Sequence, residues 1–328
     1  MSATDRPAET AIATQGALPG LLRDAGAWRK LLPGLSFAVF LLIGATFTDV
    51  FFTERNIANL LRQVVANGLI SLGMLLVILT GGIDLSVGPM VALGGVLFAG
   101  LADQYDLAPA LAAAVVAGTL AGLFNGVVIA RFRLQPFIVT LATMGLFRGI
   151  VFLYTESPIA PAHPEFRVLG VPLWGQFSPG MGVMAACYLL AGVFLNRTAP
   201  GRSIVAVGGN AEAVRLAGIS VGRTIAAAYA LSGFLSALAG AILVSRLGIA
   251  QPSLGIAYEL DAIAACVIGG AILGGGGGSV TGTLFGVFTL GVINNLMNLL
   301  GIRSFYQDIV KGAVIILAVL LVGRGRRP

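Results

Sequence analysis

The stretch "ILTGGIDLSVGP", Ile78 to Pro89, separates two strongly apolar segments with glycines, an aspartate and a serine. A carboxylate costs roughly 2.5–3.5 kcal/mol at the centre of a bilayer even on a lenient insertion scale. Asp84 therefore either lies outside hydrocarbon or has a specific role. We expect a helix break near the inner side, where Gly81 and Gly82 end one helix and Asp84 or Ser86 begins the next.

Two interpretations of Asp84 remain open at this point. The carboxylate can cap the following helix by accepting backbone N–H groups, with no contact to any cargo. Alternatively, the exposed backbone of the break lines a translocation cavity and Asp84 holds the break open as a gate element. Irregular backbone at membrane depth is tolerated only where it is buried in protein or faces water.

The composition around this stretch is that of an integral membrane protein. Of 328 residues, 57% are hydrophobic and only 10% charged, and the mean hydropathy is +0.94. A soluble domain has roughly 25% charged residues. The basic residues are scattered between apolar segments, so the calculated pI of 9.8 does not indicate nucleic-acid binding. Cys187, Cys266 and the lone His163 have no spacing typical of a disulfide or metal site, and we expect no metal and no bound cofactor.

A membrane-spanning helix needs about 20 apolar residues, which predicts an all-α bundle of about ten spans over residues 32–323. A polar segment, 1–31, is expected to be a flexible cytoplasmic tail, and 324–328 a second cytoplasmic tail. Placing both termini inside puts the basic clusters around Arg29, Arg131 and Arg202 on the cytoplasmic side, as the positive-inside rule requires. The predicted spans are 32–52, 57–79, 87–103, 108–130, 136–155, 179–196, 223–246, 259–274, 279–300 and 306–323.

Two connections between these spans have a distinctive sequence. The run "GGGGGS", Gly274 to Ser279, cannot form a stable helix interior and predicts a turn. The polar connector 196–223 is expected on the cytoplasmic side, with a short helix that starts at Asn210 as N-cap and stops at Gly218. Such a helix, unable to bury itself alone, is a candidate docking surface; a solvated loop on lipid headgroups is the alternative.

Five motifs in this order resemble a known family. They are "TGGIDLSVG" (80–88), "PFIVTLATM" (136–144), "GRSIVAVGGNAEAVRLAGI" (201–219), "YELDAIAACVIGG" (258–270) and "NNLMNLLGI" (294–302). Together they are similar to the permease subunits of ribose-type sugar ATP-binding-cassette importers, over about residues 55–323. The chain departs from the usual pattern at Pro89, Ala142 and Gly277, positions where serine, glycine and a polar residue are common.

The resemblance implies a bundle of about ten helices in the bacterial inner membrane. It also implies a second permease subunit, an ATPase subunit on the inside and a periplasmic sugar-binding protein on the outside. The sequence contains no phosphate-binding loop of the G-x-x-x-x-G-K-[ST] type, so ATP hydrolysis is expected on the partner and the chain itself is not expected to be an enzyme. The cargo is expected to be a monosaccharide, a ribose-like pentose or a hexose. The ATPase is expected to contact the connector 196–223, at Gly201, Arg202, Gly208, Gly209, Asn210, Ala213, Arg215 and Gly218.

Polar side chains within the apolar segments are candidates for the translocation path or its gate. Carboxylates, amides and hydroxyls on an apolar wall suit the hydroxyl groups of a sugar. The candidates are Asp84, Ser86, Asn125, Thr140, Glu259, Asp261, Asn294, Asn295 and Gln307. Glu259 and Asp261 are rotated by about 200° on a helix and cannot both face one path, so one is expected to cap or pair.

Other functions are weighed against this one. The same machinery could carry a branched-chain amino acid, although few intramembrane cations face the predicted core. An ion-coupled secondary transporter would use Asp84 or Asp261 as a proton site and the glycine-broken segments as discontinuous helices. A membrane-embedded enzyme is disfavoured, because no nucleophile with a base or metal set appears at membrane depth.

Overall fold

The structure is a computed structural model that describes residues 25–173, 175–303, 305–307, 309–313 and 316. This part of the chain is helical and contains no β-strand, apart from one isolated β-bridge between Ile159 and Ala250. The tails 1–24 and 324–328, and most of the predicted tenth span 306–323, lie outside the described residues. The helices are α1 (Ala25–Phe47), α2 (Glu54–Leu79), α3 (Val87–Ala102), α4 (Leu107–Phe132), α5 (Pro136–Tyr154), the 3-10 helix η2 (Pro164–Leu169), α6 (Pro179–Arg197), α7 (Ala199–Leu216), α8 (Val221–Leu247), α9 (Tyr258–Ile268) and α10 (Val280–Leu299).

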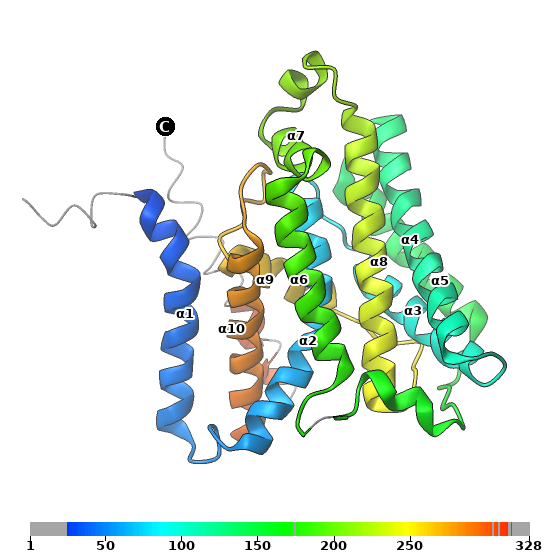
Figure 1. Cartoon of the computed structure of the whole chain (residues 1–328), viewed down its shortest axis with the longest axis vertical. Helices are drawn as coiled ribbons and strands as arrows, with labels where there is room; N and C mark the ends of the chain where they lie inside the picture. The colour runs from blue at the N-terminus through cyan, green and yellow to red at the C-terminus, as the bar shows by residue number, and fades with distance from the viewer. Residues whose placement is uncertain (1–24, 174, 304, 308, 314–315, 317–328) are drawn as a thin grey trace, which may run out of the picture.

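Six of the described helices are long and apolar enough to cross a membrane, namely α2, α4, α5, α6, α8 and α10. Figure 1 shows them as one bundle, with the start of α1 and the whole of α7 at the same end. We call this end the α7 end. It is the end that the charge distribution predicts to be cytoplasmic. The all-helical membrane architecture is therefore confirmed, whereas the count of ten spans is not.

One predicted span is clearly shorter than the sequence indicated. Helix α9 has 11 residues and ends at Ile268, so the predicted span 259–274 is wrong in its second half. At 1.5 Å per residue, α9 is about 16 Å long, roughly half of the hydrocarbon core. Helix α3 has 16 residues, in agreement with the predicted span 87–103, and starts after a non-helical segment that includes residues 82–84. Glycines 269 and 270 end α9, because the backbone of Gly270, at φ +84°, is unfavourable for other residues.

The two short helices meet at their N-termini. Gly88, in the first turn of α3, packs directly against the backbone of Gly255, which lies just before α9. A methyl group at either position would overlap the backbone of the other glycine. Each short helix follows a long one through non-helical chain, α2 before α3 and α8 before α9. The chain thus places two helix starts, each with the positive end of its dipole, against each other inside the protein.

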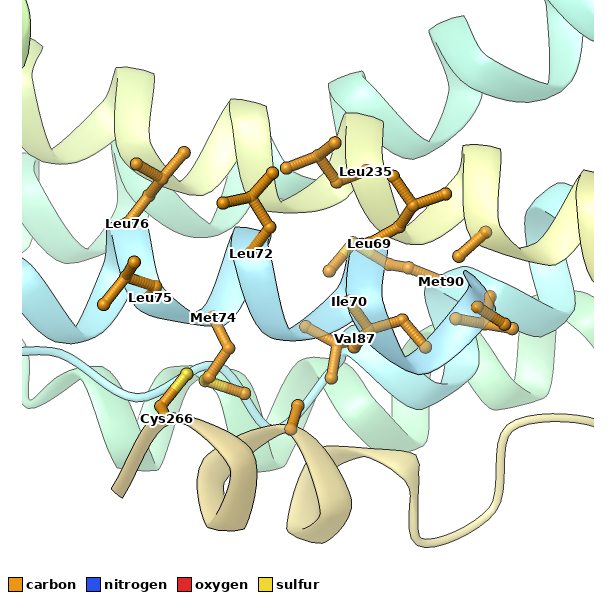
Figure 2. Close-up of a cluster of buried hydrophobic side chains, with 14 of the residues drawn as sticks. Leu69, Ile70, Leu72, Met74, Leu75, Leu76, Val87, Met90, Leu235 and Cys266 are labelled. Carbon is orange, nitrogen blue, oxygen red and sulfur yellow. The ribbon is translucent and has the colours of Figure 1, made fainter. Parts of the chain in front are cut away.

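Helix α2 forms the centre of the apolar core. Figure 2 shows Leu72, Leu76 and Leu235 between α2 and α8, and Met74 on the side of α2 that faces Cys266 of α9. The Cys266 thiol is fully buried and donates to the carbonyl oxygen of Ser71, 3.3 Å away. Both cysteines are free thiols. Cys266 therefore packs in the core, whereas Cys187 is only half-buried.

Close glycine contacts bring α4 and α8 together. Gly118 of α4 and Gly233 of α8 pack reciprocally, and an added methyl group on either would overlap the other's carbonyl oxygen. Gly122 lies in the same way against the carbonyl oxygen of Tyr229. Small residues allow such approach where no hydrophobic effect drives one membrane helix against another. Asn125 of α4 and Ser232 of α8 lie on these two helices, and both bond to the segment between α2 and α3.

Candidate translocation site

The segment between α2 and α3, Thr80 to Ser86, carries a buried polar cluster. Asp84 and Ser86 are 0% exposed. Oδ1 of Asp84 accepts hydrogen bonds from the backbone N–H of Ser86 at 3.0 Å and from its hydroxyl at 2.6 Å. The other carboxylate oxygen accepts from the hydroxyl of Ser232 on α8 at 3.1 Å. Asp84 thus satisfies both oxygens within the protein, as a buried carboxylate requires.

Two further helices close this cluster. Asn125 of α4 donates its side-chain amide to the hydroxyl of Ser86 at 2.7 Å. The carbonyl oxygen of Ile83 accepts from Thr140 of α5 at 3.1 Å and from the hydroxyl of Tyr229 of α8 at 3.3 Å. The break is therefore hydrogen-bonded to α4 through the side chain of Ser86, and to α5 and α8 through the carbonyl oxygen of Ile83. We call Asp84, Ser86, Asn125, Thr140, Tyr229 and Ser232 the break cluster.

Four of the nine predicted path residues thus lie together: Asp84, Ser86, Asn125 and Thr140. The prediction that Asp84 caps helix α3 differs from the structure in one respect. Asp84 binds the N–H of Ser86, which is itself the N-cap of α3, and does not bind the first turn of the helix. The side-chain oxygen of Asn125 is buried without a hydrogen-bond partner among the described residues. Apart from this oxygen of Asn125, the side chains of the break cluster bond to one another or to the backbone of the break.

The remaining predicted path residues lie elsewhere. Glu259 lies half-buried beside Gly88 of α3, at the junction of the two helix starts. Asp261 forms an ion pair with Lys311 at 3.2 Å. The two carboxylates of α9 therefore have different neighbours, as their angular separation predicts. Asn295 exchanges amide hydrogen bonds with Asn56 of α2 at 2.8 and 3.0 Å.

Asn294 and Gln307 are also outside the break cluster. Asn294 is 8% exposed, and its side-chain oxygen has no hydrogen-bond partner within the described part of the chain. Gln307 donates to the side chain of Asn298 at 2.9 Å and to the carbonyl oxygen of Ile302 at 2.8 Å. These contacts attach the chain after α10 to the end of that helix. The role of both residues in a path stays a prediction.

Sequence reasoning missed Arg148 of α5, which is not among the predicted site residues. One terminal nitrogen of its guanidinium donates to the carbonyl oxygens of Pro252 and Leu254, at 2.6 and 2.8 Å. Arg148 therefore anchors the non-helical chain that leads into α9. The signal was present, because a single arginine inside the apolar run "TLATMGLFRGIVFLY" calls for a specific partner. Ser232 and Tyr229 carried no such signal, since a serine or tyrosine in a membrane helix is common.

The connector 196–223 is a helix rather than a loop. Arg197 ends α6, and α7 follows in two segments that bend at Asn210, whose φ is −159°. The side chain of Asn210 accepts the backbone N–H of Ala213 at 2.9 Å. Gly218, at φ +81°, follows the last turn. The predicted N-cap and stop are both confirmed, whereas the helical segment before Asn210 was not predicted.

The two segments of α7 have different surroundings. Gly201 and Gly208 belong to the first segment and are packed against backbone: Gly201 against the end of α6, and Gly208 against Leu79 and Gly276. Gly276 also donates its N–H to the carbonyl oxygen of Leu79 at 3.1 Å. The end of α2, the glycine run and α7 therefore meet at one point. From this point the chain leads directly into the break that carries Asp84.

The second segment of α7 projects into solvent. Ala213 and Arg215 are exposed, as are Arg202 and Gly209 of the first segment. Arg215 and Glu212 form an exposed ion pair with two hydrogen bonds. That bond holds the pKa of Glu212 below its usual range and raises the pKa of Arg215. The pair therefore stays charged throughout the physiological range and offers both signs of charge to a partner.

The helices, the buried break and the exposed α7 together define a multi-pass membrane permease. Residues 56–319 match the family described as the permease component of branched-chain amino acid transport systems, and the chain belongs to this family. It is 46% identical to the ribose import permease protein of Bacillus subtilis (strain 168) over 303 residues, which cover 90% of this chain and 93% of that protein. It is 43% identical to the ribose import permease protein of Escherichia coli (strain K12) over 297 residues, 88% of this chain and 91% of that protein.

A third relative extends the similarity to another sugar. The chain is 38% identical to the L-arabinose transport system permease protein of Escherichia coli (strain K12) over 289 residues, which cover 87% of each chain. No solved structure matches the chain. These findings confirm the resemblance that the five sequence motifs indicated.

Proposed function

We propose that the chain is the membrane permease subunit of an ATP-binding-cassette importer that carries a monosaccharide across the bacterial inner membrane. The similarity to ribose and arabinose permeases along nearly the whole chain carries this proposal. The family description names branched-chain amino acids, but relatives at 38–46% identity are named for sugars. Ribose is the first candidate cargo, since the ribose permeases are the more similar group.

The partners follow from the same family. We propose a second permease subunit, an ATPase subunit on the cytoplasmic side and a periplasmic sugar-binding protein. ATP is bound and hydrolysed by the ATPase, and this chain holds no cofactor of its own. The exposed second segment of α7, with Ala213 and Arg215, is the proposed contact to the ATPase.

The geometry of α7 provides a route for coupling. Gly208 packs on Leu79, the last residue of α2, and the break cluster begins a few residues later. A displacement of α7 by the ATPase therefore acts on the start of the break without an intervening side chain. An ATPase can shift the bundle between two states only through contacts that differ between them. The break cluster then keeps α3, α4, α5 and α8 together as one unit during the shift.

Uptake by reconstituted vesicles tests this function. The permease, its ATPase and its binding protein are reconstituted, and uptake of radiolabelled ribose, arabinose and leucine is measured with ATP. We expect ATP-dependent uptake of a sugar and none of leucine. Leucine uptake would establish the amino-acid alternative. Uptake by this chain alone under a proton gradient would establish an ion-coupled transporter.

Cross-linking tests the α7 contact separately. Cysteine is introduced at Ala213 or Arg215, and at Gly175 of the connection between η2 and α6 as a control remote from α7. We expect both α7 variants to cross-link to the ATPase and the control not to. Free modification of both positions with and without the ATPase, and no cross-link, would contradict the assignment.

A further inference from the structure

Two cavities adjoin helix α6: one lies between α6, α7 and the start of α8 at the α7 end, and the other lies between α2, α6 and α8. The first, of about 470 Å³, is bounded by Ile204 of α7, by Ser220 and Arg223 at the start of α8, and by Phe194 of α6. The second, of about 250 Å³, continues along α6 and α8 and is lined by Leu72, Cys187, Leu231 and again Phe194. Phe194 lines both cavities, so the two adjoin at its side chain. The first cavity includes the polar side chains of Ser220 and Arg223 in its lining, whereas the second is lined by apolar side chains and the Cys187 thiol.

The mouth of the first cavity carries groups that bind an anion. Arg223 is exposed, and its guanidinium has no hydrogen-bond or ion-pair partner among the described residues. It lies in the first turn of α8, where the helix dipole favours negative charge. Ser220 caps only the N–H of Arg223, at 3.4 Å. The N–H groups of Val221 and Gly222 have no acceptor within the described chain, as in helix starts that bind phosphate.

The second cavity is of the opposite character. Its walls are the side chains of leucines, phenylalanines, Ala191 and the Cys187 thiol, on helices α2, α6 and α8, which are long and apolar enough to cross a membrane. Figure 2 shows Leu72, Leu76 and Leu235, which line it, between α2 and α8. From Arg223 to Leu235 the rise along α8 is about 18 Å at 1.5 Å per residue. One leaflet of the hydrocarbon core is about half of 30 Å thick.

We propose that the two cavities form one binding site for a phospholipid of the adjacent leaflet. Its anionic phosphate contacts Arg223 and the N-terminus of α8, and one acyl chain fills the apolar groove between α2, α6 and α8. Three features favour a phospholipid as the ligand. The positive charge of Arg223 lies at one end, the groove has an apolar wall, and the distance between the two is close to the thickness of one leaflet. The site is independent of the cargo. It also lies under α7, so the bound lipid supports the helix that the ATPase is proposed to contact.

Lipid retention tests the proposal. The full chain is purified in mild detergent and bound phosphatidylglycerol is measured by native mass spectrometry. We expect Arg223→Gln to lower retention at least about tenfold, as loss of a hydrogen bond to a charged group does. Ala191→Trp, which fills the groove at a distance from the charge, is expected to lower it as well. Arg202→Gln is the matched control, because Arg202 is an exposed arginine of α7 outside both cavities.

A second readout needs no variant. Cys187 lines the groove and is half-buried, whereas Cys266 is fully buried, so a maleimide reports on Cys187 in the native chain. We expect phosphatidylglycerol added to delipidated protein to slow this reaction, and diacylglycerol, which lacks the phosphate, not to. Equal protection by both lipids would show an apolar contact without headgroup recognition and would overturn the proposal. Unchanged lipid retention in Arg223→Gln would also overturn the proposal. If Cys187 instead becomes reactive when residues 1–24 are removed, or when a second copy of the chain dissociates, the groove is covered by that segment or that copy and the proposal is likewise overturned.

Discussion

Ser232 of α8 donates its hydroxyl hydrogen to Oδ2 of Asp84, 3.1 Å away, although the two residues are 148 positions apart in the chain. The bond joins the break between α2 and α3 to the helix that packs along both. Asp84 is fully enclosed and has no contact with open space. We infer that its carboxylate positions the break and does not itself bind the cargo.

Asp84→Asn is therefore expected to fold and to retain uptake. An amide oxygen can still accept from the N–H and hydroxyl of Ser86, and the hydroxyl of Ser232 can accept from the new amide. We expect a loss below about 1 kcal/mol in the free energy of unfolding, because weaker neutral bonds are offset by removal of a buried charge. Thermal unfolding in detergent and sugar uptake in vesicles measure the two quantities.

Asp84→Ala is the contrasting variant. It leaves the N–H of Ser86 and the two buried hydroxyls of Ser86 and Ser232 without their acceptor, at about 1–3 kcal/mol for each group. The yield of folded protein in the membrane is expected to fall sharply. A well-folded Asp84→Asn protein without ATP-dependent uptake would show instead that the charge acts in gating. Full uptake by a stable Asp84→Ala protein would exclude both roles.

Gly208 and Gly209 offer a comparison between adjacent positions of α7. A methyl group at Gly208 would overlap the backbone of Leu79 and Gly276, whereas at Gly209 it would meet nothing within 4 Å. Gly208→Ala is expected to cost about 1–3 kcal/mol, the usual range for overpacking. Gly209→Ala is expected to be neutral. ATPase activity and uptake, measured in parallel, should separate in Gly208→Ala, with hydrolysis retained and uptake reduced; equal coupling in both variants would contradict the proposed route through Leu79.

Asn56 and Asn295 should behave as a pair. Each amide donates to the oxygen of the other, and Asn56 also donates to the carbonyl oxygen of Phe51 at 2.8 Å. Asn295→Leu leaves buried polar atoms on Asn56 unsatisfied, which costs about 1–3 kcal/mol. The double variant Asn56→Leu, Asn295→Leu is expected to lose less than the sum of the single variants. A double-mutant cycle on the thermal unfolding temperature measures this coupling, with the exposed Asn196→Leu as control; strict additivity would show that the amides do not interact.

The ion pair of Asp261 and Lys311 connects α9 to the chain that follows α10. Its side chains are only 9% and 24% exposed, so removal of one charge is costly. Lys311→Met is expected to destabilise the protein by about 3 kcal/mol, and Lys311→Arg by much less. Adding Asp261→Asn to Lys311→Met should restore part of the stability, since no single buried charge is then left. Unchanged thermal unfolding in Lys311→Met would show that the pair contributes nothing.

The sequence predicted the helical bundle well because long apolar segments with small residues have few other solutions. It also placed the break at Thr80–Ser86, the N-cap Asn210 and the stop at Gly218, since each has a local cause. The length of α9 was overestimated, because the apolar composition continues past Ile268 into Gly269, Gly270 and Ala271, which are not helical.

The candidate site was only partly predictable. Asp84 stood out because it is charged, and Ser86, Asn125 and Thr140 because they are polar within apolar helices. Their assembly into one cluster depends on the packing of α4 against α8 through Gly118 and Gly233, which no local pattern encodes. Arg148 and Lys311 were not among the predicted site residues. Their partners, backbone carbonyls and Asp261, are distant in sequence and became visible only in the fold.

The meeting of Gly88 with Gly255 has a consequence for how this protein can change over evolutionary time. Each glycine occupies space that a methyl group on the other would need, and Gly255 has in addition a φ of +76°. No single substitution at either position can be compensated by shrinking a neighbour, because the neighbour already has no side chain. Related chains should therefore retain glycine at both positions, even where the exposed glycines of α5 and α7 are replaced by other residues.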